Sequence, residues 1–411
     1  MLTSRLHPVP RFALPYTAAD FAAGLLALLR RVPEPERFGL SGDSPKFWTR
    51  SGRQALLLLL RALDLKPGSG VALPLFTDPS LVKAIINAGL KPVFIDVDQQ
   101  YLTIDPESLE SKRGSFSSVV AVHLFGQVAD MPAILHSAGN VPVIEDTAHA
   151  PLSYLDGRMV GKFGVASFYS FASTKYWPAG GGGLAVVHDP LLARRMAELT
   201  QSLTLPSHFH ELSNVFLQAT KAAVFTRPLY GTLGKPLRRW VEKWAILEPH
   251  LDESAISRPQ AAIAIRQASR IAHRVEQQRA NSLRLLLQLS STEDAVLPFE
   301  RPHTRYNYHL FPVLLRSSGE RAAVRRSMWE RFVDTSIIYS NVVTESTCLG
   351  YQGGCPVSEA VANRLITLPN YASLSDREID RVADVFLSSV RDCRSRVSRQ
   401  QYPEPVRLAH W

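Results

Sequence analysis

Residues 141–188 read VPVIEDTAHAPLSYLDGRMVGKFGVASFYSFASTKYWPAGGGGLAVVH. Three short apolar runs within them, VPVIE, VASFYSF and GLAVV, are rich in β-branched and aromatic residues and are bounded by Gly, Pro and Asp. Such runs predict buried strands. Earlier in the chain, strands expected at 71–75 and 90–96 flank a helix expected at 80–88. This alternation indicates an α/β fold with a mostly parallel sheet.

Polar side chains follow the ends of the first two strands of this stretch. Asp146 and His149 follow the first strand, and Ser170 and Lys175 stand at and after the end of the second. Open α/β sheets bind their ligands beyond the carboxyl ends of strands. A lysine for a Schiff base and an aspartate beside a pyridinium nitrogen are what pyridoxal 5'-phosphate (PLP) requires. The stretch therefore predicts a PLP site.

The ordered set Asp-x-x-His, Ser-x-x-x-x-Lys and Gly-Gly resembles the core of the DegT/StrS-type nucleotide-sugar aminotransferases, a branch of the fold-type-I PLP enzymes. The resemblance implies that Lys175 is the Schiff-base lysine and that Asp146 is the partner of the pyridinium nitrogen. It further implies that His149 lies against the cofactor ring and that Ser170 binds the phosphate. One such aspartate or lysine alone would more often be a turn residue or a solvated charge, so the set carries the inference.

A second segment points to the cofactor phosphate. Ser51-Gly52-Arg53-Gln54 opens a strongly apolar helix expected to reach Leu63. Backbone N–H groups at a helix N-terminus attract phosphate. The resemblance implies that Gly52, Arg53 and Gln54 bind the cofactor, with Arg53 in place of the family's Thr. The alternative is an ordinary helix start.

Two positions depart from the family at the flanks of the cofactor. Asp78 stands where the family has an aromatic residue stacked on the pyridine ring. Phe76 or Trp177 is then the substitute, unless His149 acts alone.

The family also has an Asn that reaches the phosphate of the partner subunit. Residues 252–255 read Asp-Glu-Ser-Ala and contain no Asn. Either Ser254 or Ser257 takes its place, or this contact is absent.

We expect a large PLP-binding domain, with the aspartate aminotransferase-like fold, followed by a smaller C-terminal α/β domain. In the smaller domain, 306–315 and 335–343 predict strands on either side of a helix at 319–333. The resemblance makes His309 and Tyr339 candidate substrate contacts. The expected division is 1–250 for the N-terminal segment and large domain, 251–290 for one long linker helix, 291–390 for the small domain and 391–411 for a solvated, mobile tail.

Residues 206–250 are the least family-like part of the chain. They are apolar, basic and Trp-bearing, and they are broken by Pro228 and Pro236. Amphipathic basic segments of this kind contact membrane interfaces, and they also pack on partner subunits. Both interpretations stay open, and peripheral membrane contact through 206–250 is one of them.

Composition sets the remaining limits. The 411 residues carry a net charge of +9, which suits anionic ligands, but no zinc-finger spacing or aromatic-interleaved basic repeat indicates nucleic-acid binding. Three cysteines argue for a reducing compartment, and no signal peptide is recognisable, so we expect a cytoplasmic protein. Cys348 and Cys355 lack the spacing of a metal site, and we expect no metal.

The resemblance implies a PLP-dependent transaminase that moves an amino group from an amino acid, usually L-glutamate in the family, to a keto-sugar nucleotide in amino-sugar and polysaccharide biosynthesis. It also implies a homodimer with the active site at the subunit interface. Lys175 argues against the related sugar dehydratases, in which His replaces this lysine. Two alternatives remain: a non-catalytic binding protein on the same scaffold, and a transaminase for a lipid-linked or other non-nucleotide substrate.

Overall fold

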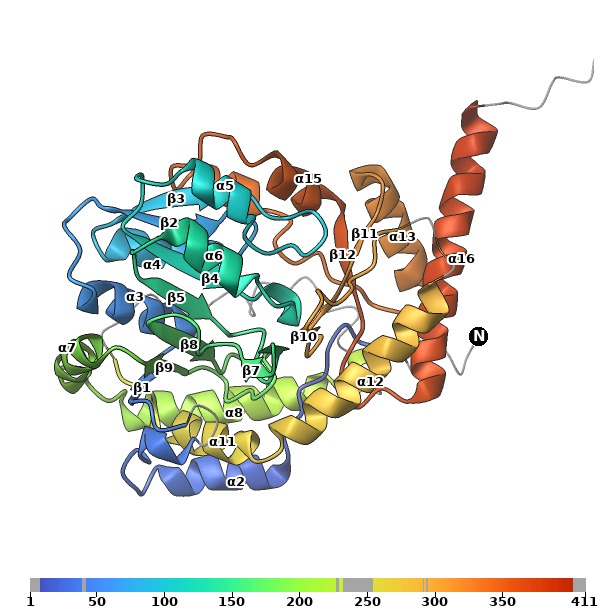
Figure 1. Cartoon of the computed structure of the whole chain (residues 1–411). Coiled ribbons are helices and arrows are strands. Elements are labelled where there is room, and N and C mark those ends of the chain that lie inside the picture. Colours follow the sequence, from blue (N-terminus) through green and yellow to red (C-terminus); the bar gives the residue numbers. More distant parts are fainter. Residues whose placement is uncertain are drawn as a thin grey trace, which may run out of the picture.

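A seven-stranded sheet forms the centre of the computed structural model (Figure 1). The structure describes residues 8–38, 42–226, 229–231, 254–290, 292 and 295–401, with side chains as far as 395. In the order in which they pair, the strands are β1 (Lys46–Thr49), β9 (Gly183–Val187), β8 (Ala166–Ser170), β5 (Val143–Asp146), β4 (Ser118–Val122), β2 (Gly70–Pro74) and β3 (Lys91–Ile95).

Whether two neighbouring strands run parallel or antiparallel follows from the segment that connects them. The neighbours from β8 to β3 pair in parallel, whereas β9 pairs antiparallel with both β8 and β1. The loop 171–182 between β8 and β9 contains no helix, so the chain returns beside the strand that it has just left. The expected α/β fold with a mostly parallel sheet is confirmed.

Two layers of helices cover the sheet. Helices α3 (Gly52–Ala62), α4 (Pro79–Asn87) and α7 (Pro190–Gln201) cover one face, and α5 (Pro106–Ser111) and α6 (Met131–Ala138) cover the other. In β4, Val120 and Val122 belong to the first hydrophobic layer, and Val119 and Ala121 to the second. Both faces are buried, which is why this strand reads as a continuous apolar run.

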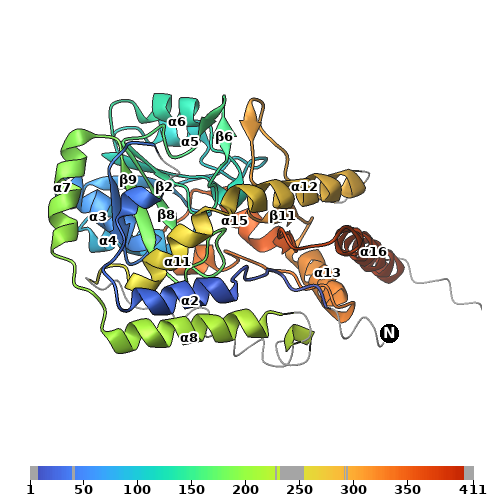
Figure 2. The same ribbon diagram turned by 90° about the horizontal axis from the view of Figure 1, so that it is seen from below.

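Three further helices lie together at one edge of the sheet. Helices α2 (Ala18–Ala27) and α8 (His208–Val224) both contact α11 (Arg258–Ala268) (Figure 2). Asp20 is fully buried between them, where it pairs with Arg266 at 3.1 Å and Arg270 at 2.5 Å. These ion pairs hold α2 against α11.

The single linker helix predicted from Ile256 is wrong, because the structure has two helices there. α11 ends at Ala268, and α12 (Ile271–Leu289) begins after a break at Ser269 and Arg270. At the break, Arg270 N–H bonds to Gln267 O, three residues back, while its guanidinium reaches Asp20. The break lets α11 pack on α2 while α12 packs on α16 (Asp376–Gln401).

The C-terminal part of the chain is built on a second, two-stranded sheet. Strands β11 (Phe311–Leu314) and β12 (Leu365–Leu368) pair antiparallel, and α13 (Ser318–Glu330) packs against α16 beside them. Val313, Ile366 and Phe386 are fully buried in their shared core. The remaining short elements are η1 (Pro35–Arg37), η2 (Leu124–Gly126), β6 (Tyr154–Leu155), β7 (Arg158–Met159), β10 (Thr304–Arg305), α14 (Val342–Thr347) and α15 (Pro356–Arg364).

The strand predicted at 335–343 is wrong. Only Ser336 bridges to Thr367, and the chain then turns into α14. Tyr339 has a left-handed backbone, with φ of 60°, which no extended strand allows. β12 pairs with β11 instead. Its sequence, LITL, is no more apolar than IIY at 337–339, so apolar character alone does not distinguish the strand from the turn.

The chain beyond Val390 continues as helix α16 to Gln401, where we expected a mobile tail. Arg394 pairs with Glu320 on α13 at 3.0 Å, and Asp392 pairs with Arg331. Residues 402–411 lie outside the described part of the chain.

Asp96 connects the central sheet to the C-terminal part. It follows β3, is 7% exposed, and accepts hydrogen bonds from Val357 N at 3.0 Å, Ser358 N at 2.8 Å and Ser358 Oγ at 2.7 Å. A carboxylate on a distant strand thus caps the N-terminus of α15, a function that a local residue usually performs.

Replacing Asp96 with Ala should destabilise the protein by about 3 kcal/mol, because buried N–H groups of α15 lose their acceptor. The free energy of unfolding in urea measures this loss. Asp64→Asn is the control, since the side chain of Asp64 is 75% exposed and its ion pair with Arg195 should contribute less than about 1 kcal/mol. Equal stability of the Asp96 and Asp64 variants would contradict the assignment of Asp96 as the cap of α15.

Candidate active site

A cavity of about 1540 Å³ opens at the carboxyl ends of β5 and β8. Its walls come from the N-terminus of α3, the loop 171–182, helix α8, helix α13 and residues 335–341. Seven Lys or Arg residues line it against three Asp or Glu residues, so the cavity favours anions.

Asp146 and Lys175 both line this cavity. Asp146 is the last residue of β5 and is 8% exposed, and its Oδ1 accepts a hydrogen bond from Ala148 N at 2.9 Å. Burial raises the pKa of Asp146 to about 6, while the Ala148 N–H group and the positive charge of Lys175 oppose that rise. The pair therefore places one acid and one amine in the same cavity, as the sequence predicts.

His149 lies on the same wall as a neutral imidazole. Its Nδ1 accepts the N–H group of Phe125 at 3.2 Å, so the ring proton belongs on Nε2. Burial and the nearby charge of Lys175 hold the pKa of His149 well below its ordinary value. The ring of Tyr339 is stacked with it at 6.4 Å between centroids.

The two candidate substrate contacts occupy different places. Tyr339 lines the cavity, and burial raises its pKa far enough to keep it a neutral phenol. His309 is buried behind His149, with ring centroids 4.7 Å apart, and contacts Tyr176 on its other side. His309 is not among the described residues of the cavity wall.

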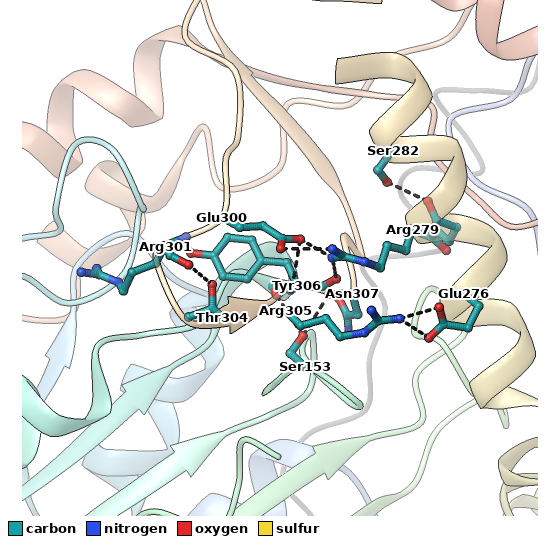
Figure 3. A network of polar contacts seen from close by, with 12 residues as sticks. Ser153, Glu276, Arg279, Ser282, Glu300, Arg301, Thr304, Arg305, Tyr306 and Asn307 are labelled. Carbon is teal, nitrogen blue, oxygen red and sulfur yellow. Dashed lines mark hydrogen bonds and ion pairs between the residues drawn. The ribbon is translucent and has the colours of Figure 1, made fainter. Parts of the chain in front are cut away.

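A polar network around Asn307 reaches Arg279 of helix α12 (Figure 3). Asn307 also holds the backbone of His149. Asn307, fully buried, donates to His149 O at 3.0 Å and to Pro151 O at 2.8 Å. Arg279 of α12 donates to Tyr306 O at 2.7 Å and so holds the residue before Asn307 against that helix. The sequence analysis did not identify Asn307, because a single Asn far from the motif carries no local signal.

The predicted phosphate segment forms one end of the cavity. Ser51 caps α3, accepting from Gln54 N at 3.2 Å, and Gly52, Arg53 and Ser170 line the wall. A Cβ on Gly52 would lie 3.0 Å from the Cβ of Ser170, so the glycine allows β8 to approach the helix N-terminus closely. Three predicted residues thus line the cavity together at the start of α3.

Gln54 also lines the cavity, but its side chain holds the local structure together. Its Oε1 accepts from Arg50 N at 2.6 Å, and its Nε2 donates to Ser254 O at 3.0 Å. Gln54 therefore joins α3 to the segment that precedes α11.

Neither proposed substitute for the stacked aromatic residue lines the described cavity wall. Phe76 is fully buried and meets Phe125 edge-on, and Trp177 packs against Phe38 at 4.9 Å. Asp78 lines the cavity and caps α4, accepting from Ser80 N at 2.9 Å.

Helix α8 supplies a wall that the sequence analysis did not predict. His210, Asn214, Gln218 and Lys221 all line the cavity, at the spacing of one helical face. Ser173, two residues before Lys175, donates to Gln218 Oε1 at 2.7 Å. The polar spacing and the nearby Gly180–Gly183 run are the signals that could have predicted this packing.

A buried ion pair fixes α8 in place. Glu211, fully buried, pairs with Arg258 of α11 at 2.6 Å. The opposite face of α8 carries the exposed rings of Phe209 and Phe216. Residues 227–228 and 232–253, the second half of the predicted 206–250 insert together with Asp252 and Glu253, lie outside the described residues, so membrane contact stays a prediction.

A second buried pair lies behind Asp146. His123 Nδ1 accepts from Ala129 N at 3.1 Å, so its Nε2 donates to Glu145 Oε2 at 3.1 Å. Burial acts to raise the pKa of Glu145, but His123 and the N–H groups of Gly164 and Gly161 hold it below its ordinary value. The last two residues of β5 are thus anchored on opposite sides of the sheet.

The described residues offer no candidate for a metal site or a membrane span. No group of His, Cys, Asp and Glu in the described ranges could hold a metal ion. Among the helices that the structure describes, none combines the length and the apolar character needed to cross a membrane.

Comparison with known proteins gives full-length relatives. The chain is 28% identical to a UDP-N-acetyl-3-dehydro-alpha-D-glucosamine 3-aminotransferase of Acidithiobacillus ferrooxidans, covering 89% of this chain and 90% of that protein. It is 29% identical to the spore coat polysaccharide biosynthesis protein SpsC of Bacillus subtilis, covering 82% of each.

Solved structures share the fold. The aminotransferase TlmJ of Streptoalloteichus hindustanus superposes with a TM-score of 0.74 at 24% identity, covering 95% of this chain and 100% of TlmJ. The Streptococcus pneumoniae protein Spr1654 in its PLP form gives 0.75 at 18% identity, covering 94% of this chain and 100% of that one.

The sequence model of one family matches residues 46–233 and 236–387, which together make up most of the chain. The match takes in the sheet, the loop 171–182 and both sides of the cavity. The resemblance seen in the strand-end motif is confirmed, and the chain belongs to the DegT/DnrJ/EryC1/StrS aminotransferase family.

Proposed function

We propose that this aminotransferase uses PLP to transfer an amino group from L-glutamate to the keto group of a nucleotide-linked sugar. The observation that carries the proposal is the placement of Asp146 and Lys175 in one anion-favouring cavity at the ends of adjacent parallel strands. Relatives named for a nucleotide-linked amino sugar and for polysaccharide biosynthesis support the substrate class.

The residues present fit PLP. Gly52 lets Ser170 approach the start of α3 so closely that a Cβ on Gly52 would lie 3.0 Å from the Ser170 Cβ, and it stands at a helix N-terminus suited to a phosphate. Asp146 would hold the ring nitrogen, His149 would lie against the ring, and Ser170 with the N–H groups of Gly52 and Arg53 would hold the phosphate. When bound, PLP supplies an electron sink for charge that develops on the carbon beside the amino nitrogen.

Asp146 acts as the counter-ion of the pyridinium nitrogen. With a pKa of about 6, it is mostly ionised at neutral pH, and a cation beside it would lower that pKa further. The Ala148 N–H group fixes one carboxylate oxygen and orients the other. The buried position makes the interaction stronger than it would be in water.

Lys175 holds the cofactor and moves the proton. With PLP supplying the electron sink, its Nζ would accept the proton that leaves the carbon of the amino donor and would donate a proton to the sugar carbon that gains the amino group. The lysine lies in a turn closed by Lys175 N and Ala172 O at 2.9 Å, and the bond between Ser173 and Gln218 fastens that turn to α8.

The keto-sugar enters on the side of Tyr339, whose phenol can donate a hydrogen bond to a sugar oxygen. His309, behind His149, acts through that ring. We also propose a homodimer with the site at the subunit interface, as the family resemblance implies. All three cysteines are free thiols, which agrees with a cytoplasmic location.

Lys175→Ala should remove the visible absorbance of the bound cofactor and lower the transamination rate by at least about 10⁴-fold, since both the covalent holder and the proton carrier are lost. Absorbance spectra and a coupled glutamate assay measure the two effects. Lys83→Ala, an exposed lysine on α4, should leave both unchanged. Persistence of a borohydride-reducible band in the Lys175 variant would mean that another lysine holds the cofactor.

Asp146→Asn should stabilise the apoprotein by about 3 kcal/mol at pH 7.5, because burial disfavours the ionised carboxylate. The folded-state pKa lies above the unfolded value, so wild-type stability falls as pH rises from about 4 to above 6. The gain in the variant should therefore shrink towards zero at about pH 4. Urea unfolding of both proteins across this pH range tests the prediction. A difference in the free energy of unfolding that does not change with pH would contradict burial of the ionised carboxylate as the cause.

The function itself is tested with purified protein, added PLP, L-glutamate and a panel of keto-sugar nucleotides. We expect a yellow protein whose colour glutamate discharges and whose colour one member of the panel restores. A colourless protein that takes up no PLP would overturn the proposal. Discharge by glutamate without restoration by any keto-sugar nucleotide would overturn the substrate class.

A further inference from the structure

We propose that Gln218 of helix α8 positions Lys175, and that it does so through its hydrogen bond with Ser173. The proposal rests on the proposed function, in which the Lys175 amine both holds the cofactor and carries a proton. It adds a positioning residue that lies outside the strand-end motif, on a helix in the least family-like part of the chain.

Lys175 lies in the middle of a loop whose two ends are closed by backbone hydrogen bonds. The loop is 171–182, and the N–H groups of Ala179 and Gly181 both donate to Phe171 O, at 2.8 Å and 3.1 Å. The described residues between these ends form turns and bends rather than a helix or a strand. The position of the lysine backbone therefore depends on the contacts that the loop makes with its surroundings.

Gln218 contacts this loop at both of its ends. Its Oε1 accepts the hydroxyl of Ser173, two residues before Lys175, at 2.7 Å. Its stem fills the space over Gly180, where an added Cβ would lie 2.3 Å from Gln218 Cγ. Gln218 is only 3% exposed, and a hydrogen bond away from water is stronger than one at the surface. One side chain thus connects the start of the loop to its end.

Helix α8 is itself anchored, so Gln218 offers a fixed acceptor. Glu211 lies seven residues before Gln218, two helical turns away on the same face. It is fully buried and accepts from Arg258 Nη2 at 2.6 Å and from the Arg258 backbone N–H group at 2.9 Å. Asn214, one turn from Gln218, donates to Gly180 O at 3.4 Å. These contacts hold the helix at a fixed distance from the loop.

The length of the lysine side chain makes this control of the backbone important. Four carbons separate the backbone of Lys175 from its Nζ, and they leave the amine many positions when it is not joined to the cofactor. A displacement of about 1 Å in a reacting group can cost about 100-fold in rate. Holding Ser173 in place narrows the range of positions that the Lys175 amine can reach.

The test compares PLP with pyridoxamine 5'-phosphate by fluorescence titration of the apoprotein. The aldehyde carbon of PLP forms a C=N bond with Lys175 Nζ and loses its oxygen as water, whereas the amine of pyridoxamine 5'-phosphate does not react with the lysine. Ser173→Ala and Gln218→Met should each raise the Kd for PLP by about three-fold to ten-fold, because each removes the bond that holds the lysine turn. The Kd for pyridoxamine 5'-phosphate should change by less than about two-fold. The double variant should match the single variants, since both remove the same bond.

Turnover gives a second readout. Each single variant should lower kcat by about ten-fold and leave the KM for L-glutamate within about two-fold, because the proton carrier is displaced while the substrate contacts stay. A coupled glutamate assay measures both constants.

Gln201→Met is the matched control, because Gln201 is exposed at the end of α7. It should leave both dissociation constants and kcat unchanged. An equal rise for PLP and pyridoxamine 5'-phosphate would give the bond a general structural role and overturn the proposal, and so would additive losses in the double variant. If Gln218→Met does not fold, an unchanged Kd for PLP in Ser173→Ala overturns it. Wild-type protein that binds neither compound would instead overturn the proposed function.

Discussion

The site is organised around one buried carboxylate, whose burial disfavours its negative charge. Asp146 ends a central strand, is almost fully buried, and has a pKa of about 6. The hydrogen bond from His123 to Glu145 anchors the strand immediately behind it. The sheet, both helix layers and the loop after β8 together hold this carboxylate in the same cavity as Lys175, where a bound cation would lower its pKa.

Helix α8 forms one wall of the cavity at the strand ends. The same helix reaches the lysine turn through Gln218, the start of α3 through His210, and α11 through Glu211. These contacts are all made within one chain, so a single copy of the chain builds this part of the site. The helix therefore links the geometry at the amine to the geometry at the phosphate end.

The sequence predicted those features whose signals are local. The strand-end motifs, the start of α3 after Ser51 and the alternation of strands and helices all follow from patterns within a few residues. Tyr339 was placed in a strand because its neighbours are apolar, whereas its left-handed backbone depends on tertiary packing. His210, Asn307 and Gln218 could not be predicted for the same reason, since each is held in place by a residue more than 40 positions away.

The glycine run also restricts how this site can change over time. A methyl group on Gly180 would lie 2.3 Å from Gln218, one on Gly181 would lie 2.5 Å from Gln260, and one on Gly183 would meet the backbone of Ser51. Three separate helices are thus packed against a surface with no side chains. Substitutions in the loop and in those helices must therefore occur together, and a lineage that loses these glycines must also lose or shift the helix that covers them.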